Sequence, residues 1–353
     1  MQLQKEGIFM DGFNMLSIKL KHCRNCFSIA QNKHYVAAVG DQIVIYLKEN
    51  WAVQCVIPSK MFAHPYSLQF LSEHTFIVKN NYAQYMVYDV LKKEVLWKFK
   101  PRGYDSIDIN LIVSSNGQVF DILTYHNYNR CCSQLMISPE AQQYEIRDLA
   151  ETAITIEGWH GKGSGCSKIR LHKGLNEKMY LLKGYMTSET LHEEYTVEYV
   201  LFQKRIDVQS FWKPVKQWRF DKPIKFKANL DGKLFVRSEA KMPIYFDEQC
   251  IVWNDFVCED WLTGQHYCFD EQDNLSTPLR MKRRYDSQHI TDFWLVPRGH
   301  TIQIRQYKTW ELVPPFFDIE NRCKEEICDV AVLENTRKVL IGTMSGLFLC
   351  EQV

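Results

Sequence analysis

The sequence predicts an all-β fold made of repeated four-stranded units, and three observations support this. Apolar, β-branched and aromatic runs of strand length recur at intervals of roughly ten residues, separated by Gly, Asn, Asp or Pro. The runs group into units that align with one another. The last unit lacks one strand, and one unassigned strand stands near the beginning of the chain.

Two units align element by element, at Cys26–Pro58 and Tyr66–Phe99. Each reads as four short strands with a tight turn between the second and the third. These turns carry Gly40-Asp41 and Asn80-Asn81, residue types that tolerate a positive φ. We therefore expect each unit to be a four-stranded sheet that runs from an inner strand to an outer one.

Further units follow, at 107–147, 153–220, 223–279 and 289–316. The two central ones are long, and we expect insertions within about 153–220 and 247–287. A period of about 35 to 50 residues with four strands is typical of a β-propeller. Counting the final unit gives seven blades, with six as the fallback, in a single domain over 1–353.

The ends of the chain complement each other. The last unit has only three strands, Cys328–Leu333, Lys338–Thr343 and Gly346–Cys350. The alternating run Met15–Leu20 precedes the first complete unit. Since an open sheet edge is a pairing hazard, we predict that this run joins the last blade and closes the ring. The structural alternative, a pair of β-sandwiches, explains the strands but not this complementarity.

Two dipeptides of the second unit suggest a family. Tyr88-Asp89 ends the predicted third strand, and Glu73-His74 precedes the second. With the repeat pattern, they make the chain resemble the WD40-like β-propeller superfamily, whose repeats carry Trp-Asp and Gly-His at such places. The resemblance covers nearly the whole chain, implies the architecture and carries over no functional residue.

The composition and net charge of the chain argue against some classes of binding partner. The chain has 353 residues, 46% of them hydrophobic and 24% charged, which suffices for a core without metal or disulfide. The formal net charge of +1 gives no global field toward nucleic acid or an anionic membrane. We therefore expect no nucleic-acid partner, and no apolar run approaches the roughly 18 residues of a membrane span.

The cysteines indicate the compartment. There are 12, and the first residues carry Glu6 and Asp11 without the apolar stretch of a secretory leader. Cysteines of such chains usually stay reduced, so we expect a cytoplasmic protein.

The spacing Cys23-x-x-Cys26 is compatible with a metal or redox site, and Cys323 with Cys328 forms a looser second pair. A structural zinc site needs two such pairs at one tetrahedron. The first pair lies in a predicted turn without the glycines of a zinc knuckle. We therefore expect buried thiols, whether or not the pairs approach one another, and no metal or other cofactor.

The Gly-rich segment Gly158–Cys166 invites a phosphate-loop interpretation. Such a loop needs Ser or Thr directly after its lysine and a helix behind it, but Lys162 precedes Gly163. We expect a flexible hairpin whose Trp159, His160 and Lys162 are exposed enough to contact a partner.

Acidic residues between two tryptophans raise the question of hydrolysis. Paired carboxylates need a fixed separation in a cleft, which this order in sequence does not provide. We therefore predict a solvated loop anchored by Trp253 and Trp261, with the acidic and nearby groups Asp255, Glu259, Asp260, His266 and Asp270.

The function we expect is that of a non-catalytic scaffold for a protein or peptide. Loops between blades, and between second and third strands, emerge on one face and carry Tyr and Arg, which dominate binding hot spots. The candidate residues are His64, Tyr66, Tyr82, Arg102, Tyr104, Arg284 and Tyr285. The alternative is a small-molecule or glycan-processing enzyme with carboxylates or histidines converging in the central channel. The oligomeric state stays open.

Overall fold

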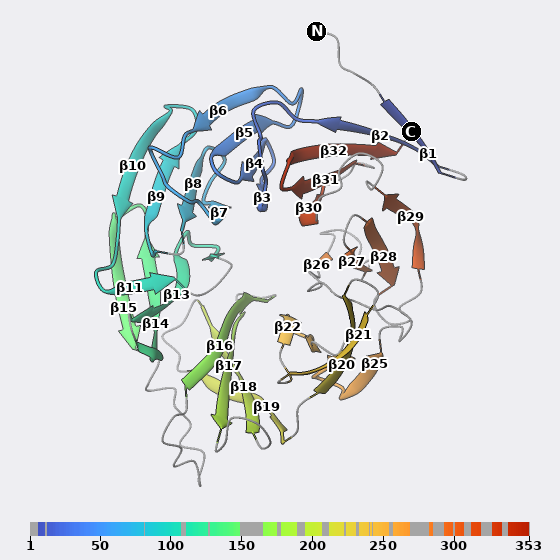
Figure 1. The fold of residues 1–353 in the computed structure, drawn as a ribbon. Coiled ribbons are helices and arrows are strands. Elements are labelled where there is room, and N and C mark those ends of the chain that lie inside the picture. Colours follow the sequence, from blue (N-terminus) through green and yellow to red (C-terminus); the bar gives the residue numbers. More distant parts are fainter. Residues whose placement is uncertain are drawn as a thin grey trace. The chain divides into compact units, whose positions relative to one another are not determined.

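The structure is a computed structural model of the chain. It describes residues 6–10, 13–80, 82–106, 111–125, 128–148, 165–174, 178–188, 195–206, 212–221, 224–230, 233–239, 241, 243–253, 257–268, 282–284, 293–298, 301–306, 312–318, 327–333 and 338–352. The regular structure of these residues is antiparallel β-sheet, which confirms the predicted all-β class (Figure 1). The chain divides into two compact units, Met1–Phe99 with Leu279–Val353, and Lys100–Pro278.

The first unit joins the two ends of the chain in one sheet of order β1-β2-β32-β31-β30. Its strands are β1 (Glu6–Met10), β2 (Phe13–Lys19), β30 (Ile327–Val332), β31 (Lys338–Thr343) and β32 (Gly346–Gln352). The pairs run from Met15 with Gln352 to Lys19 with Phe348, and the Leu20 N–H donates to the Leu347 carbonyl at 2.8 Å. The predicted pairing of Met15–Leu20 with the last unit is therefore confirmed. The outer strand β1 was not predicted.

The first two complete units are sheets with the predicted strands. One consists of β3 (Ser28–Gln31), β4 (Tyr35–Val39), β5 (Ile43–Leu47) and β6 (Val53–Ile57). The next consists of β7 (Ser67–Phe70), β8 (Thr75–Lys79), β9 (Tyr85–Asp89) and β10 (Glu94–Phe99). The first unit also holds a sheet of β26 (Lys282–Arg284), β27 (Phe293–Arg298), β28 (Thr301–Gln306) and β29 (Leu312–Asp318).

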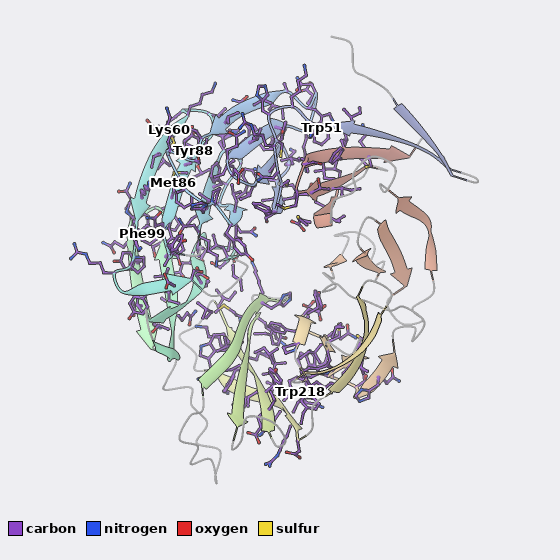
Figure 2. All side chains as sticks on the ribbon, in the orientation of Figure 1. Trp51, Lys60, Met86, Tyr88, Phe99 and Trp218 are labelled. Atoms are coloured by element: carbon purple, nitrogen blue, oxygen red, sulfur yellow. The ribbon has the colours of Figure 1, made fainter. Side chains whose placement is uncertain are left out.

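The β3–β6 sheet is covered on both faces. All residues of β4 are buried, with Ala37 and Val39 in one apolar cluster and Val36 and Ala38 in another. The first cluster continues into the β7–β10 sheet, where Figure 2 labels two of its members, Met86 and Tyr88. The second continues into the β30–β32 strands through Leu340, Leu347 and Leu349. Because side chains alternate along a strand, this two-sided burial explains the uninterrupted apolar run of β4.

The second unit holds four sheets. The strands of the first are β11 (Tyr104–Ser106), β12 (Ile112–Val113), β13 (Val119–Tyr125), β14 (Tyr128–Ser138) and β15 (Gln143–Asp148). The second has β16 (Gly165–Lys173), β17 (Lys178–Ser188), β18 (Tyr195–Arg205) and β19 (Lys213–Phe220). The third is a two-stranded sheet of β20 (Ile224–Leu230) and β21 (Lys233–Glu239). The fourth has β22 (Pro243–Phe246), β23 (Cys250–Trp253), β24 (Val257–Asp260) and β25 (Gln265–Cys268).

One predicted unit differs from the structure. The segment 223–279, expected as a single long unit, contains the β20–β21 hairpin and the complete β22–β25 sheet. The extra element is therefore the hairpin, and residues 250–268, expected within an insertion, include strands β23, β24 and β25. Strand periodicity does not distinguish one long unit from a hairpin followed by a complete sheet, because it indicates where strands lie but not which strands pair.

Three sheets share the turn between their first two strands. A side-chain oxygen of Asn32, Ser72 or Asp247 accepts the backbone N–H groups two and three residues later, at 2.8 to 3.3 Å. This is the turn geometry that Asn, Ser and Asp favour.

The turn before the fourth strand also recurs. A residue there has a positive φ in four sheets, at Trp51 (59°), Lys93 (56°), Gln142 (50°) and Gly264 (75°). A backbone hydrogen bond between these two turns recurs in three sheets. The N–H groups of Lys48, Val90 and Trp261 donate to the carbonyls of His34, His74 and Gln249. These sheets are therefore copies of one structural repeat.

Candidate partner-binding surface

Two loops of the first unit meet at one end of the β7–β10 sheet. The connection 58–66 links β6 to β7, and a turn of 80 and 82–84 links β8 to β9. The His64 and Tyr82 rings lie 6.5 Å apart between centroids at 64°, and the Tyr66 N–H donates to the Lys79 carbonyl at 2.8 Å. The structure thus brings together three of the predicted binding residues.

Two large side chains on these loops are exposed. Tyr82 is 54% exposed and Met61 is 38% exposed, while Tyr66 is half-buried. His64 is exposed as well. We call Met61, His64, Tyr66 and Tyr82 the loop surface.

The buried side chain of Asn80 holds the two loops together. Its amide nitrogen donates to the Ala63 carbonyl at 2.9 Å, which fixes the connection from β6. Its oxygen accepts the N–H groups of Tyr82 and Gln84 at 3.0 and 3.1 Å, which fixes the turn. One asparagine therefore satisfies backbone groups of both loops, as buried polar groups require.

The backbone near Asn80 adopts conformations that need such support. His64 and Ala83 have φ values of 51° and 52°, a region that residues with a Cβ rarely enter. Such residues persist only where their surroundings hold them, and they cluster at functional sites.

The buried ring of Phe62 anchors the connection from β6 to β7 in the core. It is 1% exposed, and the Lys98 ammonium lies 5.8 Å from its ring centroid. The same ammonium donates to the Met61 carbonyl at 2.9 Å. The loop surface thus rests on a fixed base, so a partner would bind it with little loss of loop entropy.

Other loops lie at the same end of their sheets, because alternate turns of an antiparallel sheet share an end. They are segment 20–27, the turn 40–42 and the turn 343–346. The Cys26 N–H donates to the Thr343 carbonyl at 2.8 Å, and the Gln42 side chain donates to the His22 carbonyl at 2.6 Å. We call this end of the first unit, with the loop surface, the loop end.

A glycine permits the close approach of these loops. Gly346 has a φ of 144°, and a Cβ there would lie 2.7 Å from the Cys23 carbonyl oxygen. The neighbouring Met344 is 51% exposed.

Cys23 and Cys26 are buried beside this glycine, as predicted. The thiols share a hydrogen bond, which lowers the pKa of Cys23, while burial raises the pKa of Cys26. Cys323 lies outside the described residues. Within the described residues, no group of three His, Cys, Asp or Glu side chains is placed to hold a metal ion.

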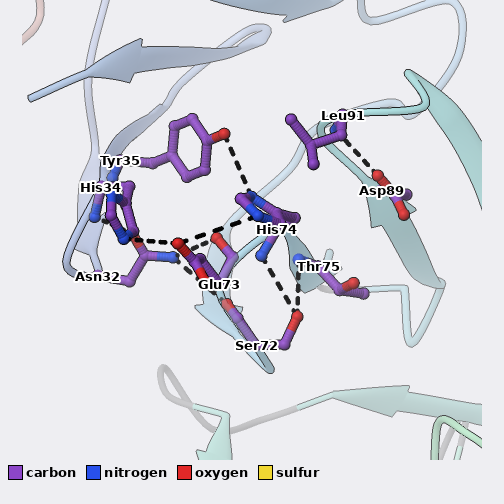
Figure 3. A network of polar contacts seen from close by, with 9 residues as sticks. All are labelled: Asn32, His34, Tyr35, Ser72, Glu73, His74, Thr75, Asp89 and Leu91. Atoms are coloured by element: carbon purple, nitrogen blue, oxygen red, sulfur yellow. Dashed lines mark hydrogen bonds and ion pairs between the residues drawn. The ribbon is translucent and has the colours of Figure 1, made fainter.

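The opposite end of the same sheets carries a polar network that sequence reasoning missed (Figure 3). The Asn32 amide donates to the Glu73 carbonyl at 2.9 Å, and the His34 Nε2 lies 2.6 Å from the Glu73 Oε1. The Tyr35 hydroxyl lies 3.3 Å from the His74 Nδ1. Burial and the Glu73 carboxylate together raise the pKa of Tyr35. These contacts join the β3–β4 turn to the β7–β8 turn.

The second unit repeats this link. The His172 Nε2 lies 2.8 Å from the Glu248 Oε2, joining the β16–β19 sheet to the β22–β25 sheet. Glu248 follows the turn residue Asp247 as Glu73 follows Ser72. The recurrence of the glutamate at equivalent turns favours a structural role. The sequence signal for it is Ser-Glu or Asp-Glu that ends one residue before a strand.

The predicted solvated acidic loop was wrong for Glu259 and Asp260, which are 5% and 3% exposed. Glu259 accepts a hydrogen bond from the Trp218 indole at 2.8 Å and lies 3.5 Å from the Lys216 ammonium. Asp260 accepts the Leu262 and Thr263 N–H groups. The carboxylates are buried because the fold supplies these donors.

The other predicted binding residues are spread along the chain. Arg102 is exposed, and the half-buried Tyr104 begins β11, paired with Tyr125. Arg284, expected in a connection, lies in β26 opposite Phe293, because β27 supplies a backbone partner there. Outside the described residues lie Tyr285, Trp159, His160 and Lys162.

Comparisons with known proteins bear on the fold. No protein-family model matches the sequence, and no curated protein matches it. The crystal structure of the computationally designed Ika8 protein is similar, with a TM-score of 0.55, 12% identity, and coverage of 95% of this chain and 98% of that one. At this identity the similarity concerns the fold alone. No helix among the described residues has the length and apolar character to cross a membrane.

Proposed function

We propose that the chain is a seven-bladed β-propeller that binds a protein or peptide through the loop surface. The described residues form seven sheets of four or five strands and one two-stranded sheet, which we assign as an insertion. The shared turns support treating the larger sheets as blades, and the pairing of β2 with β32 supports ring closure. The WD40-like resemblance and the cytoplasmic location belong to this proposal.

One observation carries the proposed activity. Met61, His64 and Tyr82 are exposed on loops that the buried Asn80 fixes. Large apolar and aromatic side chains on rigid loops supply contact area at a low entropic cost, as at binding hot spots.

The enzyme alternative has less support. It requires titratable groups that converge in a cleft. Among the described residues, the pairs His34 with Glu73 and His172 with Glu248 join neighbouring sheets, and each glutamate directly follows a turn residue of its sheet. We therefore assign no residue a catalytic role.

The test is affinity capture from the native host with a double variant, His64→Ala with Tyr82→Ala. We expect a specific co-purifying protein to fall by about tenfold or more, since truncating two hot-spot residues costs about 1 to 2 kcal/mol each. Leu91→Ala is the matched control, because Leu91 is 55% exposed and lies in the β9–β10 turn at the opposite end. An unchanged set of partners in the double variant would refute the proposal.

A further inference from the structure

The two ends of the first unit differ in charge. The exposed cations at the loop end are Lys19, Lys21, Arg24, Lys60 and Lys98, against an exposed Asp41. At the opposite end, the exposed charges of the β3–β6 and β7–β10 sheets balance: Lys33, Lys92 and Lys93 with Glu49, Glu73 and Glu94. The charge of a nearly neutral chain is thus unevenly placed.

Ion pairing enlarges this difference. Three ion pairs of the first unit lie at the opposite end, where Glu73 meets His34 and His74, and Lys92 lies 3.7 Å from Glu94. The contacts made by loop-end ammonium groups are of another kind. Lys19 lies 5.9 Å from the Phe348 ring centroid, and Lys98 contacts the Phe62 ring and the Met61 carbonyl. The positive charge of this end therefore remains available to an anionic partner.

Large apolar side chains lie among these cations. Met61, Tyr82 and Met344 are 38%, 54% and 51% exposed. Figure 2 labels Lys60, which directly precedes Met61 in the connection from β6. A complementary partner therefore needs carboxylates for the cations and large apolar side chains for the methionines and the tyrosine.

We propose that the loop end of the first unit binds an acidic peptide segment that also carries large apolar side chains. This inference rests on the proposed function and names the chemistry of its partner. A peptide fits better than a nucleic acid, because methionine side chains offer no stacking platform for bases and apolar exposure interrupts the cations.

The experiment uses the full chain, immobilised, with three soluble probes: a glutamate–tyrosine copolymer, polyglutamate and oligothymidylate. We expect the copolymer to bind most tightly and to lose affinity as salt rises. The triple variant Lys21→Glu, Arg24→Glu and Lys60→Glu should bind it about tenfold or more weakly, because charge reversal replaces attraction by repulsion. The matched control is Lys33→Glu, Lys92→Glu and Lys93→Glu at the opposite end, which should bind within about twofold of wild type.

The outcomes separate this inference from the proposed function. Equal loss in both triple variants, no loss in the loop-end variant, or tighter binding of oligothymidylate would overturn the acidic-peptide inference. If the loop-end charges prove irrelevant but His64→Ala with Tyr82→Ala still loses its host partner, the proposed function stands without the acidic partner. Thermal unfolding of each variant checks that the exposed substitutions leave the fold intact.

Discussion

The two ends of the first unit use their polar residues differently. At the opposite end, Asn32, His34 and Glu73 bond across two neighbouring sheets. At the loop end, the Asn80 side chain bonds to the two loops of the β6–β9 segment, and the contact between neighbouring sheets is a backbone bond, from the Cys26 N–H to the Thr343 carbonyl. One end therefore uses polar side chains to hold two sheets together, and the other uses one to fix two loops beside exposed side chains.

The two asparagines test the comparison most strongly. Asn80→Ala should lower the free energy of unfolding by about 2 to 4 kcal/mol, because Asn80 is 1% exposed and its removal leaves the Ala63 carbonyl and the Tyr82 and Gln84 N–H groups without their hydrogen-bond partner. Asn32→Ala should cost less, about 1 to 2 kcal/mol. Asn32 is half-buried and its acceptors on Ser72 and Glu73 are exposed, so water can replace part of the hydrogen bonds that its side chain makes to them and to the His34 and Tyr35 N–H groups. Denaturant unfolding measures both costs. An equal cost would remove the contrast between the buried Asn80 and the more solvated Asn32.

The second unit holds a half-buried cation, Lys204, which contrasts with the exposed cations of the loop end. Lys204 lies 4.9 Å from the Trp212 ring centroid, and its ammonium donates to the Gln134 Oε1 at 3.2 Å. Burial lowers the pKa of Lys204 to about 8, below its usual 10.5. Between these values the unfolded chain holds a proton that the folded chain has lost, so stability should rise with pH and be lowest below about pH 8.

The substitution Lys204→Met removes the contribution of this ammonium to the pH dependence of stability. From pH 7 to pH 10 the free energy of unfolding of wild type should increase relative to that of the variant, by about 1 to 3 kcal/mol. Denaturant unfolding at each pH gives the free energy of unfolding of both proteins. The difference between wild type and variant separates the effect of Lys204 from that of the other titrating groups. A constant difference would show that the ammonium is solvated.

The two histidine–glutamate links give the smallest expected effects. Glu248 has a side-chain exposure of 12% and Glu73 of 55%. Glu248→Gln should therefore cost about 1 to 2 kcal/mol and Glu73→Gln about 0.5 kcal/mol or less, because solvent screens the exposed pair. Thermal unfolding of the two variants gives the order, and the reverse order would contradict a stabilising role for the buried link.

Much of the fold could be predicted because it depends on local chemistry. The apolar alternation of Met15–Leu20 and the three strands after Cys328 sufficed to predict the pairing of β2 with β32. The predicted cluster of His64, Tyr66 and Tyr82 followed from counting turns, since connections of the same kind lie at one end of successive sheets. Asn80 was recognised only as a turn residue. Its bond to the Ala63 carbonyl depends on a loop that packs against it from an earlier part of the chain.

The sequence by itself determined the strands, the turn types and the complementary ends, because periodicity and turn residues act over a few positions. Only the tertiary structure decided which distant polar groups meet. Glu259 is buried because Trp218, 41 positions earlier, donates to it, and the exposed Glu73 pairs with His34 of the preceding sheet. It also separated β20–β21 from the β22–β25 sheet. Such pairings depend on the packing of whole sheets, since the free energy of a buried charge is set by its partners and not by its neighbours in sequence.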